Sequence, residues 1–367
     1  MRLNEKKVRI MTIAELRRKI DLLDKNIVKL LNQRAKLALE IGNYKKGKSD
    51  KAYVPAREKR VLANVRKTNA GPLGKAAFYA IYREIMSSTL ALESDPRVAY
   101  LGPAATFTHE AARSRFGASV KMIDCDTIAD VFGAVQKRQA DYGVVPIENS
   151  TEGAVTYTLD EFLDTPLKIC AEIYLQISHH LLSKGSKRQV KRILSNPQVF
   201  GQCRNWLHKE MPHAELIPVT STARAAAMAS KMKASAAIAG LLTAEMYGLK
   251  IIASDIHDMI GNTTRFLVIA EKYGEATGND KSSILFSVKH KAGALYSALE
   301  SFKRYGINMT KIESRPSCLK AWEYFFFVDI EGHVEDEKVR KALKDFHSHC
   351  TLLNILGSYP SAQDMQA

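Results

Sequence analysis

The chain has 367 residues, more than one ordinary hydrophobic core organises, so we expect two or three domains. Hydrophobic residues make up 46% and charged residues 25%, as in a soluble globular protein, and no stretch is long and apolar enough to span a membrane. The formal net charge is +15, and residues 1–92 hold 22 Lys and Arg against 8 Asp and Glu, which places +14 of it there. This basic region indicates a nucleic acid or a small polyanion as partner. It lacks zinc-finger spacing and the interleaved aromatic residues of a single-strand-binding surface.

The cysteines indicate the compartment and argue against a metal. There are five, scattered and without a CxxC pair, which favours reduced thiols in the cytoplasm: Cys125, Cys170, Cys203, Cys318 and Cys350. Residues 1–10 are charged and lack the apolar core of a signal peptide. The spacing of His347, His349 and Cys350 does not fit a zinc site. We therefore expect a cytoplasmic protein without metal or cofactor.

A long helix is predicted from Thr12 to Lys46, opened by the capping box Thr12-Ile-Ala-Glu15. Its apolar residues follow a seven-residue repeat: Leu16, Ile20, Leu23, Ile27, Leu30, Leu37 and Ile41. Arg34 occupies a position of this seam. Because a guanidinium stays charged, its burial calls for an anion. The alternative is that a lone charge here only fixes helix register.

Two further cations support an anion-binding role for this helix. Lys45 lies eleven residues after Arg34, which is about three turns, and therefore nearly on the same face. The two cations are expected to line one groove. Arg17 lies about 100° round the helix and is expected to face a second subunit.

Two more helices are predicted before residue 94. Pro55 opens one, carrying Arg57 and Glu58, and another runs from Lys75 to Leu92, with Thr89 and Glu93 on one face near its end. The long helix would expose its seam unless a second copy covered it, so we predict an intertwined helical dimer.

After Pro96 the pattern changes to alternating strands and helices, which indicates an α/β architecture. Strands are expected at 98–101, 143–147, 169–177, 193–194, 216–219 and 265–270, and the helices between them include 222–232 and 236–247. In such sheets ligands bind beyond the carboxyl ends of strands. Polar groups stand at three of these ends: 149–153, 195–197 and 263–265. Turns and caps use the same residue types, so any one cluster alone is weak.

Beyond a linker at 275–280, the order strand 283–288, helix 294–305, strand 307–313, strand 324–330, helix 335–349 and strand 352–356 is βαββαβ. This order predicts a ferredoxin-like domain.

Three sets of residues resemble known families. The first, Leu16-Arg-Arg-Lys-Ile-Asp21 with Arg34, Lys45 and Arg57-Glu58, resembles the all-helical chorismate mutases. The second resembles the prephenate dehydratases: Tyr100-Leu-Gly-Pro103, Pro146-Ile-Glu-Asn-Ser150 and Thr264-Arg-Phe266. The third, Gly293-Ala-Leu295 and Glu313-Ser-Arg-Pro316, resembles phenylalanine-sensing ACT domains. Their order is that of the bifunctional P-proteins of phenylalanine synthesis.

The resemblance implies three domains: a helical dimer domain at 1–93, a two-lobed α/β dehydratase domain like a periplasmic binding protein at 97–274, and a ferredoxin-like ACT domain at 282–360. It implies chorismate and prephenate as substrates, phenylalanine as effector, a homodimer or homotetramer, and no nucleic acid, membrane or cofactor. Chorismate rearranges by an intramolecular pericyclic step, so the enzyme must hold a compact conformer and stabilise charge on the breaking ether oxygen.

For the mutase, the resemblance assigns the substrate carboxylates to Arg34 and to Arg17 of the other subunit. Lys45 would donate to the ether oxygen and Glu58 would take the substrate hydroxyl, with Arg57 and Thr89 supporting binding. Two positions depart from the common pattern. Val54 replaces an acidic residue, and Glu93 stands where Gln often donates to the ether oxygen. Because a carboxylate donates only when protonated, we expect mutase activity to fall as pH rises.

For the dehydratase, Thr264 is implied as proton donor to the leaving hydroxyl or as its positioner. Asn149, Ser195, Gln202 and Arg265 are implied to contact substrate or shape the site. Phenylalanine is expected between two ACT domains, at Gly293, Ala294, Leu295, Asn308, Glu313, Ser314, Arg315 and Pro316. Tyr296 takes a place that is more often aliphatic.

Two other functions remain open at this stage. One is a non-catalytic amino-acid sensor with a DNA-binding helical region. A DNA-binding helix should carry its cations on an exposed face, whereas Arg34 lies in the apolar seam. The other is a dehydratase whose helices serve only as a dimerisation stalk.

Overall fold

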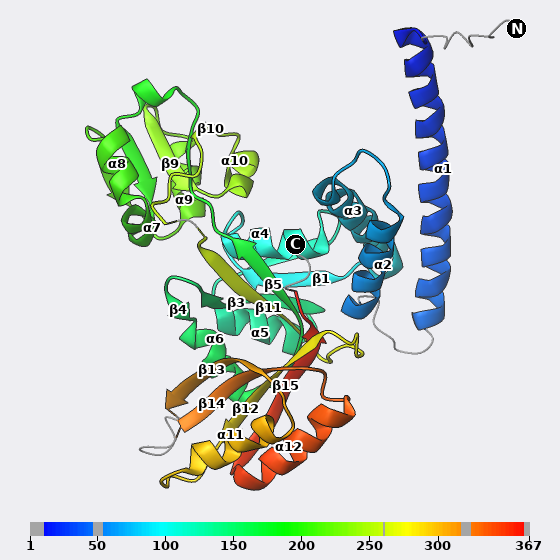
Figure 1. The fold of residues 1–367 in the computed structure, drawn as a ribbon. Coiled ribbons are helices and arrows are strands. Elements are labelled where there is room, and N and C mark those ends of the chain that lie inside the picture. Colours follow the sequence, from blue (N-terminus) through cyan, green and yellow to red (C-terminus); the bar gives the residue numbers. More distant parts are fainter. Residues whose placement is uncertain (1–10, 47–53, 260, 317–323, 363–367) are drawn as a thin grey trace, which may run out of the picture.

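The structure is a computed structural model that describes residues 11–46, 54–259, 261–316 and 324–362. The N-terminal segment 1–10 and Cys318 lie outside these ranges. Within them the chain forms a helical part, a two-lobed α/β part and a C-terminal sheet covered by two helices (Figure 1). No helix in the described ranges is long and apolar enough to cross a membrane.

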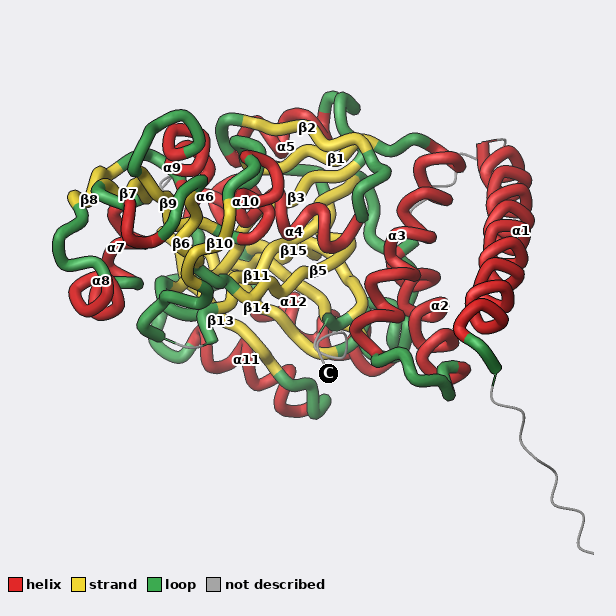
Figure 2. The backbone as a smooth tube through the Cα atoms, turned by 90° about the horizontal axis from the view of Figure 1, so that it is seen from above, coloured by secondary structure: helices red, strands yellow, loops and turns green. Residues whose placement is uncertain are grey.

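The helical part consists of α1 (Ile13–Lys46), α2 (Pro55–Thr68) and α3 (Lys75–Ser94). The predicted capping box is present, because the Thr12 amide donates to Glu15 Oε2 at 2.9 Å and the Glu15 amide donates to Thr12 Oγ1 at 3.3 Å. Figure 2 shows the three helices side by side at one end of the molecule. Helix α1 packs on α3 through its C-terminal half, where Ala38 and Gly42 are buried.

The apolar seam of α1 is exposed in this single chain. Its members are between 43% and 61% exposed: Leu16, Ile20, Leu23, Ile27, Leu30, Leu37 and Ile41. The N-terminal part of α1 projects past the rest of the chain (Figure 1). The face of α1 that packs on α3 is therefore not the apolar seam but the face beside it. Arg34 and Lys45 lie at the boundary between these two faces.

The first lobe of the middle part carries a sheet in the order β2-β1-β3-β11-β5, with the short β4 paired to β3. Its strands are β1 (Arg97–Leu101), β2 (Lys121–Cys125), β3 (Tyr142–Asn149), β4 (Gly153–Ala154), β5 (Lys168–Gln176) and β11 (Thr263–Ala270). Its helices are α4 (Phe107–Phe116), α5 (Ile128–Gln136), α6 (Thr156–Glu161) and the 3-10 turn η1 (Phe162–Asp164).

The second lobe is inserted between β5 and β11, so the chain passes between the lobes twice. Its sheet has the order β10-β6-β9-β7-β8. The strands are β6 (His180–Ser183), β7 (Arg192–Ser195), β8 (Glu215–Pro218), β9 (Ser235–Ala239) and β10 (Lys250–Ala253). The helical segments are η2 (Lys187–Gln189), α7 (Pro197–Gln202), α8 (Arg204–Glu210), α9 (Thr222–Ala229) and α10 (Leu241–Tyr247).

One predicted helix in this lobe is wrong in its first half. Residues 236–247 were expected to be one helix, but Ser235–Ala239 form β9, and α10 begins only after Gly240. Every residue of β9 is buried, between β6 and β7 and against α9. Alanine is a strong helix former, yet here tertiary packing favours small residues in a central strand and overrides that preference.

The C-terminal part has the predicted βαββαβ order: β12 (Asp280–Ser287), α11 (Ala294–Arg304), β13 (Met309–Pro316), β14 (Tyr324–Glu331), α12 (Glu337–His349) and β15 (Leu352–Pro360). The sheet order is β13-β14-β12-β15, entirely antiparallel, and both helices cover one face. The other face packs on the first lobe, where one hydrophobic cluster contains Ile147, Leu267, Phe327 and Leu356. Gly357 is required there, because a Cβ would lie 2.1 Å from the carbonyl oxygen of Ile169.

Candidate functional sites

The first candidate site is the groove between α1 and α3. Arg34 donates to Thr89 Oγ1, and Lys45 Nζ lies 2.9 Å from Glu93 Oε1. Burial lowers the pKa of the Arg34 guanidinium from its ordinary value, and the nearby charge of Arg57 acts in the same direction. The structure thus brings Arg34, Lys45, Arg57, Thr89 and Glu93 from three helices to one groove.

Gly42 permits this close approach. A Cβ on Gly42 would lie 2.7 Å from Glu93 Cγ and 3.0 Å from its carbonyl oxygen. With the buried Ala38 it forms a small-residue stripe that lets α1 lie against α3. Sequence reasoning missed this role, although Ala35, Ala38 and Gly42 follow helical spacing.

Glu58 contacts the next part of the chain, and Arg17 lies far from Arg34 along α1. Glu58 Oε2 is 3.1 Å from Nη2 of Arg115 on α4, and both side chains are largely buried. Arg17 is exposed and lies seventeen residues before Arg34, about 25 Å along α1. Within one chain Arg17 therefore does not reach the groove, which is the arrangement expected of a residue that serves a second subunit.

The second candidate site lies where the two lobes meet, and its centre is a hydrogen bond between neighbouring strands. Asn149 ends β3, and its Nδ2 donates to Thr264 Oγ1 at 2.8 Å and to Asn262 Oδ1 at 2.8 Å. The Asn149 amide is oriented by the loop that follows, because its Oδ1 accepts hydrogen bonds from the backbone amides of Thr151 and Glu152. Since Thr264 accepts from Asn149, its own hydroxyl proton points to another acceptor.

A chain of polar contacts continues into the second lobe. Gln202 at the end of α7 donates through Nε2 to Glu152 Oε1 at 2.9 Å, and its Oε1 lies 2.7 Å from Nε2 of His179. Burial lowers the pKa of His179 to about 4, so the ring is neutral near pH 7 and donates to Gln202 from Nε2. His179 was not predicted; the signal was a polar pair, His179-His180, directly after a predicted strand.

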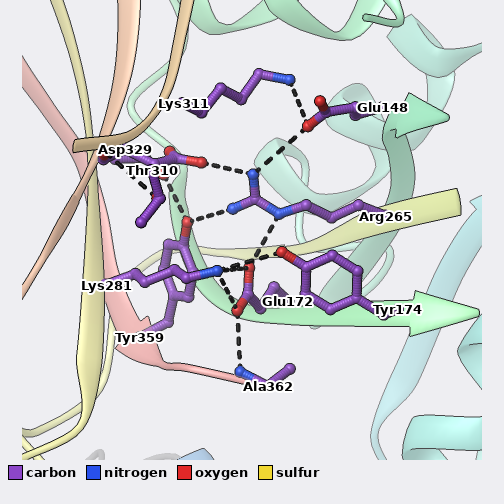
Figure 3. A network of polar contacts seen from close by, with 11 residues as sticks. Glu148, Glu172, Tyr174, Arg265, Lys281, Thr310, Lys311, Asp329, Tyr359 and Ala362 are labelled. Atoms are coloured by element: carbon purple, nitrogen blue, oxygen red, sulfur yellow. Dashed lines mark hydrogen bonds and ion pairs between the residues drawn. The ribbon is translucent and has the colours of Figure 1, made fainter. Parts of the chain in front are cut away.

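Two residues expected at this site lie away from it. Ser195 is fully buried in the second lobe and donates to the carbonyl oxygen of Ile238 at 2.9 Å. Arg265 follows Thr264 on β11 and therefore points to the opposite face of the sheet. There it contacts Glu172 together with Asp329 and Tyr359 of the C-terminal domain (Figure 3).

The residues expected to bind an effector fall on two elements of the C-terminal domain. Gly293 adopts a positive φ of 76° as the residue before α11, Ala294 is buried, and Leu295 packs on the domain's core. The segment Glu313–Pro316 forms the end of edge strand β13. Arg315 contacts Asp160 of the first lobe at 2.7 Å, and Asn308 donates to Glu331 at 3.0 Å. Tyr296 is 70% exposed.

The comparisons with known proteins agree with this division. Family models match at residues 16–94 (chorismate mutase type II), 98–273 (prephenate dehydratase) and 282–347 (ACT domain). The bifunctional chorismate mutase/prephenate dehydratase of Aquifex aeolicus is 48% identical over 95% of this chain and 98% of its own length. The protein of that description from Neisseria gonorrhoeae is 44% identical over 96% and 99%. The prephenate dehydratase of Arthrobacter aurescens, solved in complex with L-Phe, covers 72% of this chain and 90% of its own, with 34% identity and a TM-score of 0.67.

The fold and the family models together define a multidomain enzyme with a mutase domain, a dehydratase domain and an ACT regulatory domain. The chain belongs to the family of bifunctional chorismate mutase/prephenate dehydratases.

Proposed function

We propose that the chain catalyses two consecutive steps of phenylalanine synthesis, the rearrangement of chorismate to prephenate and the conversion of prephenate to phenylpyruvate, and that phenylalanine inhibits it. The domain bounds we propose are 1–93, 97–274 and 282–360. The observation that carries most of this proposal is the Asn149–Thr264 hydrogen bond at the junction of the two lobes.

In the mutase groove, Arg34 and Arg17 of a second subunit would bind the carboxylates of chorismate. Arg57 would support binding, and Thr89 would orient the Arg34 guanidinium. Lys45 would donate to the ether oxygen as negative charge develops on it. Its ion pair with Glu93 holds the ammonium in the groove at neutral pH. No nucleophile is needed, because the reaction is a rearrangement within one molecule.

The mutase site is completed by a second copy of the chain. The exposed seam of α1 fits a second α1 helix, since a row of isoleucine and leucine at heptad spacing is the pattern of helix pairing. Such pairing would bring Arg17 of the partner subunit to the groove. Sedimentation of the full chain tests this, and a monomer at micromolar concentration with full mutase activity would contradict it.

In the dehydratase, prephenate loses its carboxylate as CO2 while the ring hydroxyl leaves as water, and aromatisation drives the step. Thr264 would give its hydroxyl proton to the leaving oxygen. Asn149 supports this role, because the bond it donates to Thr264 Oγ1 directs the proton outward and stabilises the alkoxide until a proton from solvent restores the hydroxyl. Gln202 and the neutral His179 would line the other side of the junction.

The remaining assignments concern the effector and the compartment. We place phenylalanine between the ACT domains of two copies, at Gly293–Leu295 and Glu313–Pro316, with Asn308 nearby. We also propose a cytoplasmic location, because the four described cysteines are free thiols.

Two substitutions test the two activities separately. Thr264→Ala should abolish prephenate turnover and leave chorismate turnover unchanged, whereas Arg34→Ala should do the reverse. Equal loss of both activities in either variant would indicate misfolding. Retention of chorismate turnover by Arg34→Ala would instead support the alternative in which the helices are only a dimerisation stalk. The sensor alternative is disfavoured because Arg34 is bonded to Thr89 rather than displayed for DNA.

A further inference from the structure

Two residues stand directly behind the proposed dehydratase site. In the pairing of β3 with β11, Asn149 lies opposite Thr264 and Glu148 lies opposite Arg265. Because neighbouring side chains in a strand point to opposite faces, Asn149 and Thr264 face the lobe junction while Glu148 and Arg265 face the C-terminal domain. Each catalytic candidate is thus one peptide bond from a residue on the interdomain face.

The ACT domain contacts both of these residues through charged side chains (Figure 3). Lys311 of β13 lies 2.7 Å from Glu148 Oε2, and Asp329 of β14 accepts from Nη1 of Arg265. Tyr359 of β15 accepts from Nη2 of Arg265 at 2.9 Å. With Lys281 of β12, which contacts Glu172, the network draws on all four strands of the ACT sheet.

Burial makes this network sensitive to displacement. The side chain of Arg265 is 6% exposed, that of Glu172 is fully buried, and that of Asp329 is 9% exposed. Glu172 holds Arg265 from within the first lobe and also contacts Lys281 of β12 at 3.1 Å. In so little solvent a charge that loses its partner is strongly destabilised, so the ACT sheet and the catalytic strands cannot shift independently.

The strand that carries Lys311 also carries residues expected to bind the effector. Lys311, Glu313 and Arg315 alternate along β13 and share one face, and Arg315 reaches Asp160 on the same side as Lys311 reaches Glu148. A cavity beside the network is lined in part by Arg265, Lys311 and Asp329 and has room for water.

We propose that Glu148 and Arg265 are positioning residues for the dehydratase reaction, and that the ACT domain controls the reaction by holding them through Lys311 and Asp329. The inference rests on the proposed function and specifies its regulation. When phenylalanine shifts β13, the Lys311–Glu148 ion pair moves the end of β3, and Asn149 loses its alignment with Thr264.

The experiment breaks the Lys311–Glu148 pair, in which Glu148 is 41% exposed, because disruption of buried Arg265 would threaten folding. We compare wild type, Lys311→Met, Glu148→Gln and the charge swap Lys311→Glu with Glu148→Lys. The control is Lys341→Met, which removes an ACT-domain lysine paired with Glu337 at 2.7 Å on the exposed face of α12. Measurements are kcat and KM for prephenate, the half-inhibitory phenylalanine concentration, and phenylalanine binding by calorimetry. Chorismate turnover of the same preparations checks folding.

We expect Lys311→Met and Glu148→Gln to lower kcat about two- to threefold with unchanged KM. Both should raise the half-inhibitory phenylalanine concentration about fivefold or more, the lower range of coupling between sites. Phenylalanine binding should stay within about threefold of wild type, the charge swap should restore inhibition, and the control should match wild type.

Two results would overturn the inference: wild-type inhibition in both variants, or loss of phenylalanine binding itself, which would place Lys311 in the effector site. An absence of prephenate turnover in the wild type would instead refute the proposed function.

Discussion

Glu58 of α2 and Arg115 of α4 form a largely buried ion pair, 3.1 Å from Oε2 to Nη2, between the helical domain and the dehydratase domain. Glu58, which is expected to bind the hydroxyl of chorismate, is therefore held by Arg115 of the dehydratase domain. Removal of Arg115 would leave a buried carboxylate without this counter-ion, and such a group takes up a proton or moves.

Arg115→Met should lower mutase kcat/KM about tenfold, the equivalent of one oriented hydrogen bond of ~1.4 kcal/mol, with a smaller loss in Arg115→Lys. Chorismate consumption measures this, and prephenate turnover should stay within about twofold. Arg113→Met is the matched control, because Arg113 lies on the same helix and its guanidinium is 3.8 Å from the exposed Glu245. Unchanged mutase activity in Arg115→Met would show that Glu58 acts without it.

The ion pair between Lys45 and Glu93 leads to a prediction about hydrogen-bond donation. A carboxylate accepts from Lys45 but cannot donate to the ether oxygen, whereas an amide can do so. Glu93→Gln should therefore raise mutase kcat. Chorismate turnover of the two proteins under the same conditions tests this. An unchanged or lower kcat in Glu93→Gln would remove donation at this position from the mechanism.

Gly42 offers a test of helix packing. Alanine normally stabilises a helix interior by about 1 kcal/mol over glycine, but here the added Cβ would lie 2.7 Å from Glu93 Cγ. Gly42→Ala should reduce mutase activity and destabilise the helical domain by about 1–3 kcal/mol, measured by thermal unfolding. Gly133→Ala on α5, where nothing lies within 4 Å of the new Cβ, should be neutral or stabilising.

His179 makes stability depend on pH. Burial lowers its pKa from 6.5 to about 4, so between these values the unfolded chain binds more protons than the folded one. Stability is therefore complete above pH 6.5 and falls as the pH drops towards 4, by about 2 kcal/mol between pH 7 and pH 5. His179→Gln should remove this part of the pH dependence, whereas His213→Gln, at an exposed position, should not. Thermal unfolding at the two pH values decides.

Much of the architecture could be predicted because it follows local periodicity. The seven-residue repeat of α1 and the βαββαβ order of residues 280–360 are both present. The prediction that failed relied on helix propensity alone. The alanines of Ser235–Ala239 read as helix, and only their burial on every side makes them a strand.

The residue types of the sites could be predicted, but the directions in which their side chains point could not. Thr264 and Arg265 were expected together, yet strand alternation sends Arg265 into the interdomain network. The presence of β11 was predicted, but its register with β3, which pairs Thr264 with Asn149, depends on contacts over a hundred residues apart. For the same reason no sequence signal pointed to Arg115 as the partner of Glu58.

The projecting part of α1 also implies that the two activities respond differently to protein concentration. The dehydratase contacts described above all come from one chain, so its specific activity should be constant on dilution. A mutase site that borrows Arg17 across paired α1 helices should lose specific activity once the chains separate. Serial dilution would then turn one polypeptide into an enzyme with a single remaining activity.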